Sequence, residues 1–401
     1  MPELLFVSHR FPYPLNKGEK IRAYHLLRHL APHWRIRLGC LVEDPADLAH
    51  LPVLGEICAE VAAFRIDKRL QKLKALARFR PGRPLMLDYY RHPGLRRWVA
   101  ERLPGAKLAY IFSTAMAPYV LDQPATGAVR LLDMQDIDSE KWTRYAADAA
   151  MPMRAVWARE GRTLLAYERH AAAACAATFF VTAAEARRFG ELAPEVADRL
   201  DHVECGVDLG FFSPAHEFPS PYPASARRAV FTGNMDYWPN ADAVSWFATE
   251  ILPRITPRPE FWIVGANPGP AVRRLAGLPG VHVTGRVADV RPYLAHADVS
   301  VSPLRIARGI QNKVLEAMAA GRPVVASPGA FQGIRAQPGR DLLVADGATA
   351  IAEAVGAVLL AAGVQFWARA PRVAGHSAVA AADPVASWAY RFLPGSALYP
   401  I

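Results

Sequence analysis

The chain has 401 residues, of which 52% are hydrophobic and 21% are charged. One hydrophobic core rarely serves this length, so we expect two domains, and the composition excludes disordered, collagen-like and coiled-coil proteins. The net charge is +10. Residues 1–110 hold 20 basic against 10 acidic side chains, mostly within 65–107, so the remainder of the chain is neutral.

The cysteines and the apolar stretches bear on the cellular compartment. Cys40, Cys58, Cys175 and Cys205 are scattered without metal-ligand spacing, which indicates a reducing compartment and no disulfide framework. The first residues show no signal-peptide pattern. The longest uncharged stretch, 171–184, is too short and too rich in alanine to span a bilayer. These features predict a soluble, cytoplasmic protein.

The first half of the chain alternates between short apolar runs and helical patterns. A run at residues 4–8 leads into a Pro/Gly loop, and apolar residues spaced three apart from Ile21 to Leu30 precede a second run at 36–42. This order predicts the βαβ unit of a parallel sheet. Later strands are expected at residues 109–112, 128–132 and 178–182. Between 64 and 103 the chain is basic, helical and broken by prolines, which favours an insertion.

A proline-rich segment separates this series from a second one. Residues 211–223 hold four prolines among few periodic apolar positions. New strands are expected at 229–232, 261–264, 281–284, 299–303 and 323–326, and helices at 242–251, 271–276, 313–320 and 350–360. We therefore predict an α/β domain over residues 1–210, a linker over 211–228, a second α/β domain over 229–383 and a last helix within 384–401. A ligand is expected between the domains, at the carboxyl ends of the strands.

The richest motif lies between residues 283 and 327. A strand runs into a loop in which Gly309 allows close approach of a ligand to the backbone. The next helix begins with free N–H groups that suit an anion. Glu316 lies about one turn inside that helix, where its carboxylate could accept hydrogen bonds from a pair of vicinal hydroxyls. An ordinary surface helix with a solvated glutamate is the alternative interpretation.

This segment, with the sequence E-A-M-A-A-G-R-P-V-V at residues 316–325, resembles the donor-site region of GT-B glycosyltransferases of the family-4 (GT4) type. Residues 4–18, 204–208, 231–240 and 264–265 resemble further segments of that family. Together with residues 133–142 they most resemble the sugar transferases of exosortase/PEP-CTERM-linked exopolysaccharide clusters. The resemblance implies two Rossmann-like α/β domains with a cleft between them and a C-terminal helix that can cross back to the first domain.

The resemblance also implies a set of donor-binding residues. Glu316 should bind the ribose hydroxyls of a nucleotide sugar, and Arg286 and Val287 should flank the base. The backbone turns near the sugar and the pyrophosphate are expected at Gly18, Gly233, Asn234, Gly265, Gly309, Ile310, Gln311 and Asn312.

Three departures from the family pattern change its chemistry. The first glutamate of the family's pair falls at Arg308, and the cations that usually clamp the diphosphate fall at Asn234 and near Pro239. A pyrophosphate still needs cationic partners, so Lys313, Arg308 and Arg305 are the candidates. Lys313 is also a candidate catalytic residue, although a solvated helix lysine is the plainer interpretation. The histidine that often follows a strand of the first domain is missing, since residues 113–114 and 135–136 hold none.

An acidic cluster follows the strand expected at 128–132. Asp133, Asp136, Asp138 and Glu140 could supply a general base for an acceptor hydroxyl or bind a divalent ion, with Asp136 and Asp138 the preferred catalytic candidates. Capping of the next helix by Asp138 or Ser139 explains the same residues without catalysis. His9 could face the same cleft or serve as an ordinary loop histidine.

The stretch from Lys68 to Arg80 places leucines and Phe79 near one helical face and basic residues around the rest. A basic amphipathic helix suggests an anionic membrane surface. A surface helix packed on its own domain is the alternative. Nucleic acid is not an expected partner, because no aromatic-interleaved basic patch or known reader motif is present.

These observations predict a retaining glycosyltransferase in the cytoplasm, peripheral at the inner face of the cell membrane. It would transfer a sugar from a nucleoside-diphosphate donor to a lipid-linked or growing exopolysaccharide acceptor. The resemblance implies that the reaction needs no obligate metal or other cofactor. A sugar-nucleotide 2-epimerase-like enzyme and a non-catalytic sugar-nucleotide-binding subunit are the alternatives. The sequence leaves open which sugar, base and acceptor are used.

Overall fold

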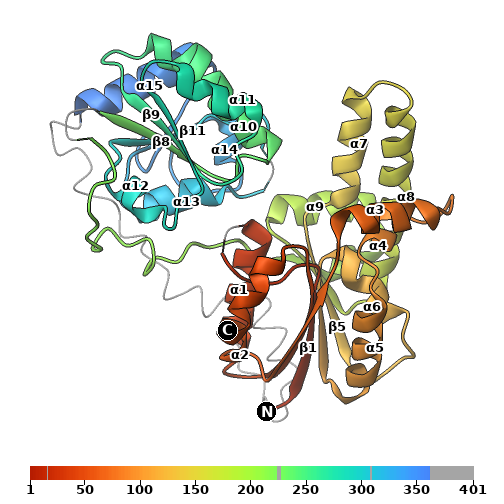
Figure 1. Ribbon diagram of the computed structural model, residues 1–401. Coiled ribbons are helices and arrows are strands. Elements are labelled where there is room, and N and C mark those ends of the chain that lie inside the picture. The colour runs from red at the N-terminus through yellow and green to blue at the C-terminus, as the bar shows by residue number, and fades with distance from the viewer. Residues whose placement is uncertain (16, 224–226, 308, 362–401) are drawn as a thin grey trace. The chain divides into compact units, whose positions relative to one another are not determined.

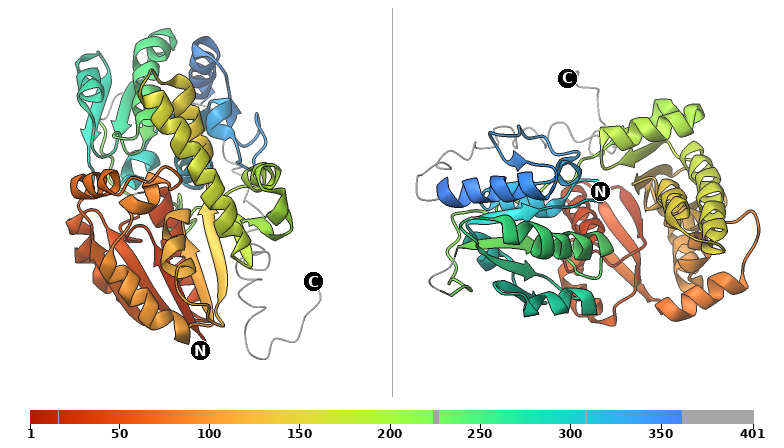
Figure 2. Two further views of the ribbon diagram at one scale, coloured as in Figure 1. Left: turned by 90° about the vertical axis from the view of Figure 1, so that its right-hand side faces the viewer. Right: turned by 90° about the horizontal axis from the view of Figure 1, so that it is seen from above.

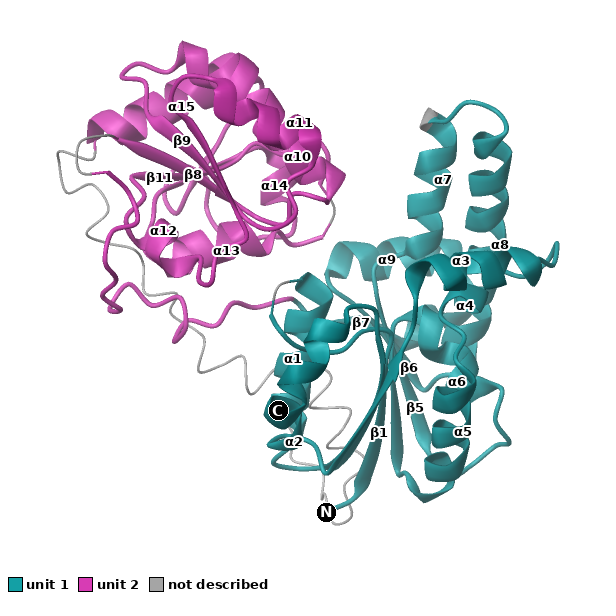
Figure 3. Ribbon diagram, viewed as in Figure 1, with its two compact units in different colours: residues 1–204, 378–401 teal, residues 205–377 magenta. Residues whose placement is uncertain are grey.

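The computed structural model describes residues 1–15, 17–223, 227–307 and 309–361. They divide into two compact units, the first of residues 1–204 and the second beginning at residue 205 (Figure 3). Each unit contains one parallel sheet with helices on its faces (Figure 1). This confirms the prediction of two Rossmann-like α/β domains. Arg308, the end of the second predicted domain and the helix predicted within 384–401 lie outside the described residues.

Unit 1 is built on seven parallel strands in the order β3-β2-β1-β4-β5-β6-β7. The strands are β1 (Glu3–Ser8), β2 (Arg35–Val42), β3 (Glu60–Arg65), β4 (Leu108–Phe112), β5 (Val129–Gln135), β6 (Ala177–Phe180) and β7 (Leu200–His202). Successive residues of β1 point to opposite faces. Leu4 and Phe6 therefore belong to one apolar cluster, and Leu5 and Val7 belong to another. Each face of the sheet thus has its own core.

Helices cover both faces of this sheet. The helices α1 (Gly18–Leu30) and α2 (Leu51–Gly55) lie over one face, and α5 (Pro93–Arg102), α6 (Ala117–Leu121) and α9 (Ala183–Leu192) lie over the other (Figure 1). On the second face, a Cβ atom at Gly39 of β2 would lie only 2.5 Å from the Trp98 ring of α5. A glycine is therefore required there for the close packing of α5 on the sheet.

The stretch expected as an insertion is divided between the sheet and its surroundings. It begins with the end of β3, an edge strand that the sequence analysis did not predict. The helices α3 (Lys68–Ala77) and α4 (Leu85–Tyr89) follow, and α5 then packs on the sheet as a crossover helix before β4. Only α3 and α4 are additions to the alternating strand–helix order.

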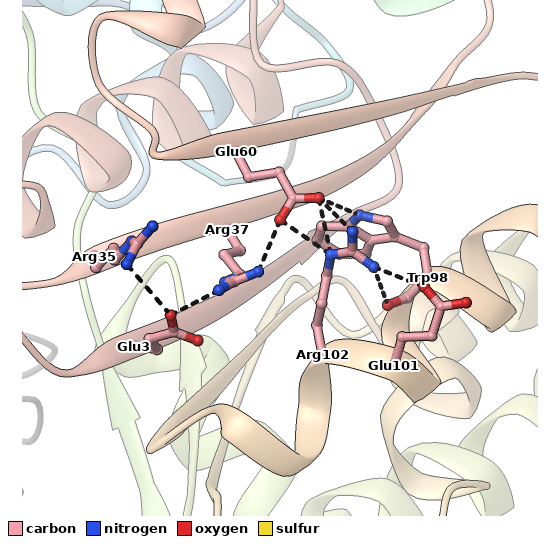
Figure 4. A network of polar contacts seen from close by, with 7 residues as sticks. All are labelled: Glu3, Arg35, Arg37, Glu60, Trp98, Glu101 and Arg102. Carbon is pink, nitrogen blue, oxygen red and sulfur yellow. Dashed lines mark hydrogen bonds and ion pairs between the residues drawn. The ribbon is translucent and has the colours of Figure 1, made fainter.

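Charged side chains join the amino ends of three strands to α5 (Figure 4). Arg37 donates hydrogen bonds to Glu3 at 2.8 Å and to Glu60 at 3.0 Å. Glu60 also accepts from Trp98 Nε1 at 2.9 Å and from Arg102 Nε at 2.8 Å. These bonds hold the pKa of Glu60 below its usual range, with the bond from Arg102 as the main cause. The network stabilises the edge of the sheet at the amino ends of the strands. Ligands of parallel sheets bind at the other edge, where the strands have their carboxyl ends.

A helical hairpin extends from unit 1 beyond its sheet (Figures 1 and 2). It consists of α7 (Asp138–Asp148) and α8 (Met153–Ala173). At its base, the buried carboxylate of Glu168 accepts hydrogen bonds from both the backbone N–H and the hydroxyl of Ser139. Burial nevertheless raises the pKa of Glu168 to about 8. This contact ties the start of α7 to α8.

Unit 2 contains six parallel strands in the order β10-β9-β8-β11-β12-β13. They are β8 (Arg228–Thr232), β9 (Glu260–Val264), β10 (Val281–Gly285), β11 (Val299–Ser302), β12 (Val324–Ala326) and β13 (Leu343–Val344). The helices are α10 (Trp238–Trp246), α11 (Pro270–Arg274), α12 (Arg291–Ala295), α13 (Asn312–Ala319), α14 (Pro328–Phe331) and α15 (Ala348–Ala361). Part of the predicted linker packs on this unit, since the Arg291 guanidinium lies 3.8 Å from the centre of the Phe211 ring.

None of the helices in the described part of the chain is long and apolar enough to cross a membrane.

Candidate functional site

Three neighbouring strands of unit 2 end in glycines. The strands β8, β9 and β10 lead to Gly233, Gly265 and Gly285 at the carboxyl edge of the sheet. A Cβ atom at Gly265 would lie 1.7 Å from the carbonyl oxygen of Gly233. No side chain can therefore stand at position 265 without a backbone shift. At Gly285, by contrast, a Cβ atom would meet no other atom within 4 Å, so only there is the space beside the backbone open.

Lys313, in the first turn of α13, places its ammonium group at this edge. Its Nζ atom donates to Asn240 Oδ1 at 3.1 Å and to Gln311 Oε1 at 3.2 Å, and it lies 5.3 Å from the centre of the Phe231 ring. Among the residues that the structure describes, no carboxylate forms an ion pair with it. Burial lowers the pKa of Lys313 to about 8. A cation held only by neutral groups remains available to an anionic ligand.

Glu316 lies almost one turn after Lys313 on α13. It is partly buried, and burial raises the pKa of its carboxyl to about 7, against the opposing effect of Lys313. The side chain thus changes between its neutral and charged forms near neutral pH. A carboxylate in this position can accept hydrogen bonds from ligand hydroxyls.

The loop before α13 brings backbone groups to the same place. Gly309 has a φ of +60°, in the left-handed region that favours glycine. Ile310 packs against the core of unit 2, and Gln311 and Asn312 are the N-cap and first residue of α13. No described side chain caps this helix, so its first N–H groups offer an anion site next to Lys313.

The other predicted cations of unit 2 differ in their surroundings. Arg286 follows β10 and is exposed, while its neighbour Val287 packs against the core. Arg305 donates to Asp242 through Nε at 3.0 Å and stacks over Trp246 at 5.2 Å. Its charge is therefore already balanced by Asp242. Lys313 is the better placed of the two for a diphosphate.

Sequence reasoning missed the amide side chains that orient this edge. Asn240 Nδ2 donates to the carbonyl oxygen of Asn234 at 2.9 Å, while its Oδ1 receives Lys313. Asn267 Nδ2 in turn donates to Asn234 Oδ1 at 3.2 Å. The available signal was an asparagine in the first turn of the helix that follows Gly233. Its lysine partner lies 73 positions further along the chain, so spacing alone could not identify the pair.

Residues 226–360 match the family described as "Glycosyl transferases group 1". The matched residues belong to unit 2. This match confirms the predicted class of enzyme, a glycosyltransferase. No curated protein is similar enough in sequence to match.

Solved structures agree on the fold over almost the whole chain. Sucrose-phosphate synthase from Thermosynechococcus elongatus is 18% identical with a TM-score of 0.66, covering 97% of this chain and 98% of that one. Anabaena Alr3699/HepE in complex with UDP and glucose is 14% identical with a TM-score of 0.60, covering 96% and 95%. WaaG, a glycosyltransferase involved in lipopolysaccharide biosynthesis, is 13% identical with a TM-score of 0.58, covering 94% and 98%.

In unit 1 of this glycosyltransferase, the first strand ends among charged groups. Gly18 begins α1, whose N-terminus no described side chain caps. Beside it, Arg10 forms ion pairs with Glu19 at 2.9 Å and with Glu43. His9 stacks on Phe112 with ring centres 6.1 Å apart. Burial lowers the pKa of His9 to about 4, so the imidazole is neutral at physiological pH.

The acidic residues at the end of β5 and the start of α7 have different surroundings. Asp133 is buried and accepts hydrogen bonds from Arg22 Nε at 2.9 Å and from the Tyr110 hydroxyl at 2.8 Å. Glu140 is paired with Arg188 at 2.7 Å. Asp136 follows β5, and Asp138 is the first residue of α7. Within the described ranges no group of three or more histidines, cysteines and acids is placed to hold a metal ion.

The sequence suggested that Asp138 or Ser139 caps the helix that follows, but α7 begins at Asp138 and no described side chain caps its start. The Ser139 hydroxyl donates to Glu168 and does not accept from the backbone of its own helix. The backbone N–H of Ile137, just before α7, donates to Glu185 at 3.1 Å. Glutamates from α8 and α9 thus serve the start of α7.

Proposed function

We propose that this glycosyltransferase moves a sugar from a nucleoside-diphosphate donor to a lipid-linked or growing exopolysaccharide acceptor, with retention of anomeric configuration. The observation that carries the proposal is the ammonium group of Lys313. It lies beside a glycine-lined strand edge and an uncapped helix N-terminus, held only by amides and a ring face. Glu316 lies close by on the same helix, where a ribose would follow the phosphates.

The proposed chemistry is electrostatic. Charge develops on the diphosphate as the bond to the sugar breaks, and preorganised donors that face this charge lower the barrier most. Lys313 and the N–H groups at the start of α13 provide such donors. The departing phosphate helps to deprotonate the acceptor hydroxyl on the same face of the sugar. No obligate metal takes part in this scheme.

The printed descriptions of similar structures support the donor class. HepE was solved with UDP and glucose and also with UDP-glucose. UDP-sugars are therefore the first donors to test. The exopolysaccharide acceptor rests on the resemblance to transferases of exosortase/PEP-CTERM clusters.

The surface of α3 supports a peripheral position at that membrane. Leu70, Leu73 and Leu76 are 48%, 64% and 62% exposed, whereas Gln71 and Ala75 are buried against the unit. The helix therefore presents its leucines outward, among basic residues, which is the reverse of a helix packed on its own domain. Such a surface suits the boundary of an anionic bilayer.

The decisive experiment is donor turnover with a panel of UDP-, GDP- and ADP-sugars, with and without a membrane lipid extract. Release of nucleoside diphosphate that depends on the extract, together with a labelled lipid product, is expected. Conversion of the donor to an epimer without the extract would establish the epimerase-like alternative. Binding without turnover of any donor would establish the non-catalytic subunit.

Membrane association has its own test. The double variant Leu73→Ser/Leu76→Ser should sediment less with vesicles of anionic lipid, whereas Leu360→Ser, which alters a 64% exposed leucine of unit 2, should not change sedimentation. Replacing Lys68, Arg69, Lys72 and Lys74 by glutamine should cost up to about 4 kcal/mol of affinity, at about 1 kcal/mol per basic residue. Added salt should release the wild-type protein from the anionic vesicles. Equal sedimentation of the wild type and all variants would contradict the membrane proposal.

A further inference from the structure

Unit 1 contains a hollow among α4, α5, α6 and the loop after α3. Its volume is about 520 Å³, within the range of about 300–1,000 Å³ that is usual for small-molecule sites. Figure 1 shows these helices side by side on one flank of the unit. The hollow is not part of the strand edge described above and lies outside the family match. Its lining takes only Arg78 and Arg80 from the basic stretch that ends at Arg80.

The lining is strongly basic. Six arginines and two aspartates border the hollow. Arg83 pairs with Asp88 at 3.4 Å, and Arg96 pairs with Asp122 at 3.4 Å. The other arginines have no carboxylate partner among the described residues. They are Arg78, Arg80, Arg91 and Arg97. The hollow therefore carries several positive charges that the protein itself does not neutralise.

Two buried donors in the same lining have no acceptor. Arg78 Nη1 and Gln123 Nε2 are both inaccessible to solvent and make no hydrogen bond within the described part of the chain. They come from segments more than 40 residues apart, yet both border this hollow. A buried donor without an acceptor costs free energy, so a ligand with acceptor oxygens would satisfy both groups.

The rim is held in place by contacts that leave the arginine side chains free. Gln71 Nε2 donates to the carbonyl oxygen of Arg91 at 3.0 Å. The Arg159 guanidinium donates to the carbonyl oxygen of Arg83 at 2.7 Å and to that of Arg80. It also lies 4.4 Å from the centre of the Phe79 ring. The backbone that carries the arginines is therefore fixed before any ligand binds, which lowers the cost of binding.

We propose that this hollow binds a group bearing two or more phosphate charges. Arginine is the side chain that best matches phosphate oxygens, because its fork donates two parallel hydrogen bonds. The hollow has a volume of about 520 Å³ and is lined by several arginines without a carboxylate partner among the described residues. This lining suits a diphosphate or a pair of phosphates better than a single carboxylate. The source is either a phospholipid headgroup, since the rim adjoins the exposed Leu76 and Phe79, or a soluble phosphorylated compound. The inference does not depend on the proposed donor site of unit 2.

Calorimetry with inorganic pyrophosphate tests the site. Arg91→Gln/Arg97→Gln should weaken binding by about tenfold or more, because charge-assisted hydrogen bonds are lost. The matched control is Arg162→Gln/Arg187→Gln, which removes two exposed arginines of unit 1 away from the hollow and should leave the affinity unchanged. Absence of pyrophosphate binding to the wild type, or equal affinities of the two double variants, would overturn the proposal.

Vesicles then identify the source. If the phosphate group belongs to a lipid, the Arg91→Gln/Arg97→Gln variant should lose binding to vesicles that contain cardiolipin. Free pyrophosphate should also compete with those vesicles for binding to the wild type. If cardiolipin vesicles bind both double variants equally while pyrophosphate still distinguishes them, the ligand is soluble. Nucleotide-sugar binding to the same variants should be unchanged. If no nucleotide sugar is turned over but the two double variants still differ in pyrophosphate affinity, only the proposed function is contradicted.

Discussion

The two sheets share a parallel topology, but their carboxyl edges are built differently. In unit 2 three neighbouring strands lead to glycines, and the ammonium group of Lys313 is held by two side-chain amides and the face of the Phe231 ring. In unit 1 the cations near the corresponding edge have carboxylate partners. Arg10 pairs with Glu19 at 2.9 Å, and Arg22 pairs with the fully buried Asp133 at 2.9 Å.

This contrast separates cations that have a carboxylate partner from a cation that has none among the described residues. A buried ion pair whose partners are both present contributes to a fixed local structure, and losing one partner leaves an uncompensated charge. The ammonium of Lys313 is partly buried and forms no ion pair among the described residues. Burial lowers its pKa, against the opposing effect of Glu316, because desolvation disfavours the charged form. Its presence in unit 2 is understandable if a ligand supplies the missing negative charge.

The largest expected effect tests the structural side of the contrast. Asp133→Ala should lower the free energy of unfolding by about 3–5 kcal/mol, because Arg22 would remain buried without its partner. Denaturant unfolding monitored by circular dichroism measures the change. Glu195→Ala, which breaks an exposed ion pair with Arg169, is the control and should cost less than about 1 kcal/mol. Similar losses in both variants would remove the distinction.

The functional side is tested at Lys313. Lys313→Met should weaken nucleoside-diphosphate binding by about 1.5–3 kcal/mol, or roughly 10–150-fold. The unphosphorylated nucleoside should bind as before, and the free energy of unfolding should not fall. Calorimetry with both ligands gives the comparison. Equal losses for the two ligands would mean that the substitution disturbs α13 as a whole and that the diphosphate contact is not made.

The amino edge of unit 1 provides an intermediate case, in which half-exposed charges join strands to a helix. Glu60→Gln should lower the free energy of unfolding by about 1–2 kcal/mol, because bonds to Arg37, Trp98 and Arg102 are weakened. The pKa of Glu60 is lowered in the folded protein, so its stabilising effect is present above the unfolded-state pKa and is lost as the pH falls through the folded-state value. The difference between wild type and variant should therefore shrink in acid. A difference independent of pH would exclude an ionic contribution.

The smallest effect concerns the pH dependence of donor binding. Glu316, with a pKa of about 7, gains its accepting charge as the pH rises, and Lys313 loses its charge above a pKa of about 8. Nucleoside-diphosphate affinity should therefore be greatest between pH 7 and 8 and fall by up to about tenfold per pH unit on either side. Glu316→Gln should flatten the acidic limb, and Lys313→Met should flatten the alkaline limb. A profile unchanged by both substitutions would contradict the proposed roles.

Local sequence was sufficient to predict most of the elements and part of the candidate site. Apolar runs of four to eight residues gave the central strands, because a strand buried on both faces is apolar throughout. Lys313 and Glu316 could be recognised together because the turn of one helix sets their spacing, and Gly309 lies in the loop just before that helix. The edge strand β3 escaped prediction although residues 61–64 form a short apolar run, because half of that run is alanine, which strands disfavour, and its residues are only partly buried.

Tertiary structure decided what each polar side chain does. Arg305 and Lys313 are both cations beside the same loop in the sequence, yet one is neutralised by Asp242 and the other rests on Asn240. The leucines of α3 follow a pattern that fits either a packed or an exposed face, and only the contacts of Gln71 and Ala75 show which side is buried. Periodicity specifies which residues share a face. Which partner meets that face depends on long-range contacts, and these determine whether a charge is balanced or left for a ligand.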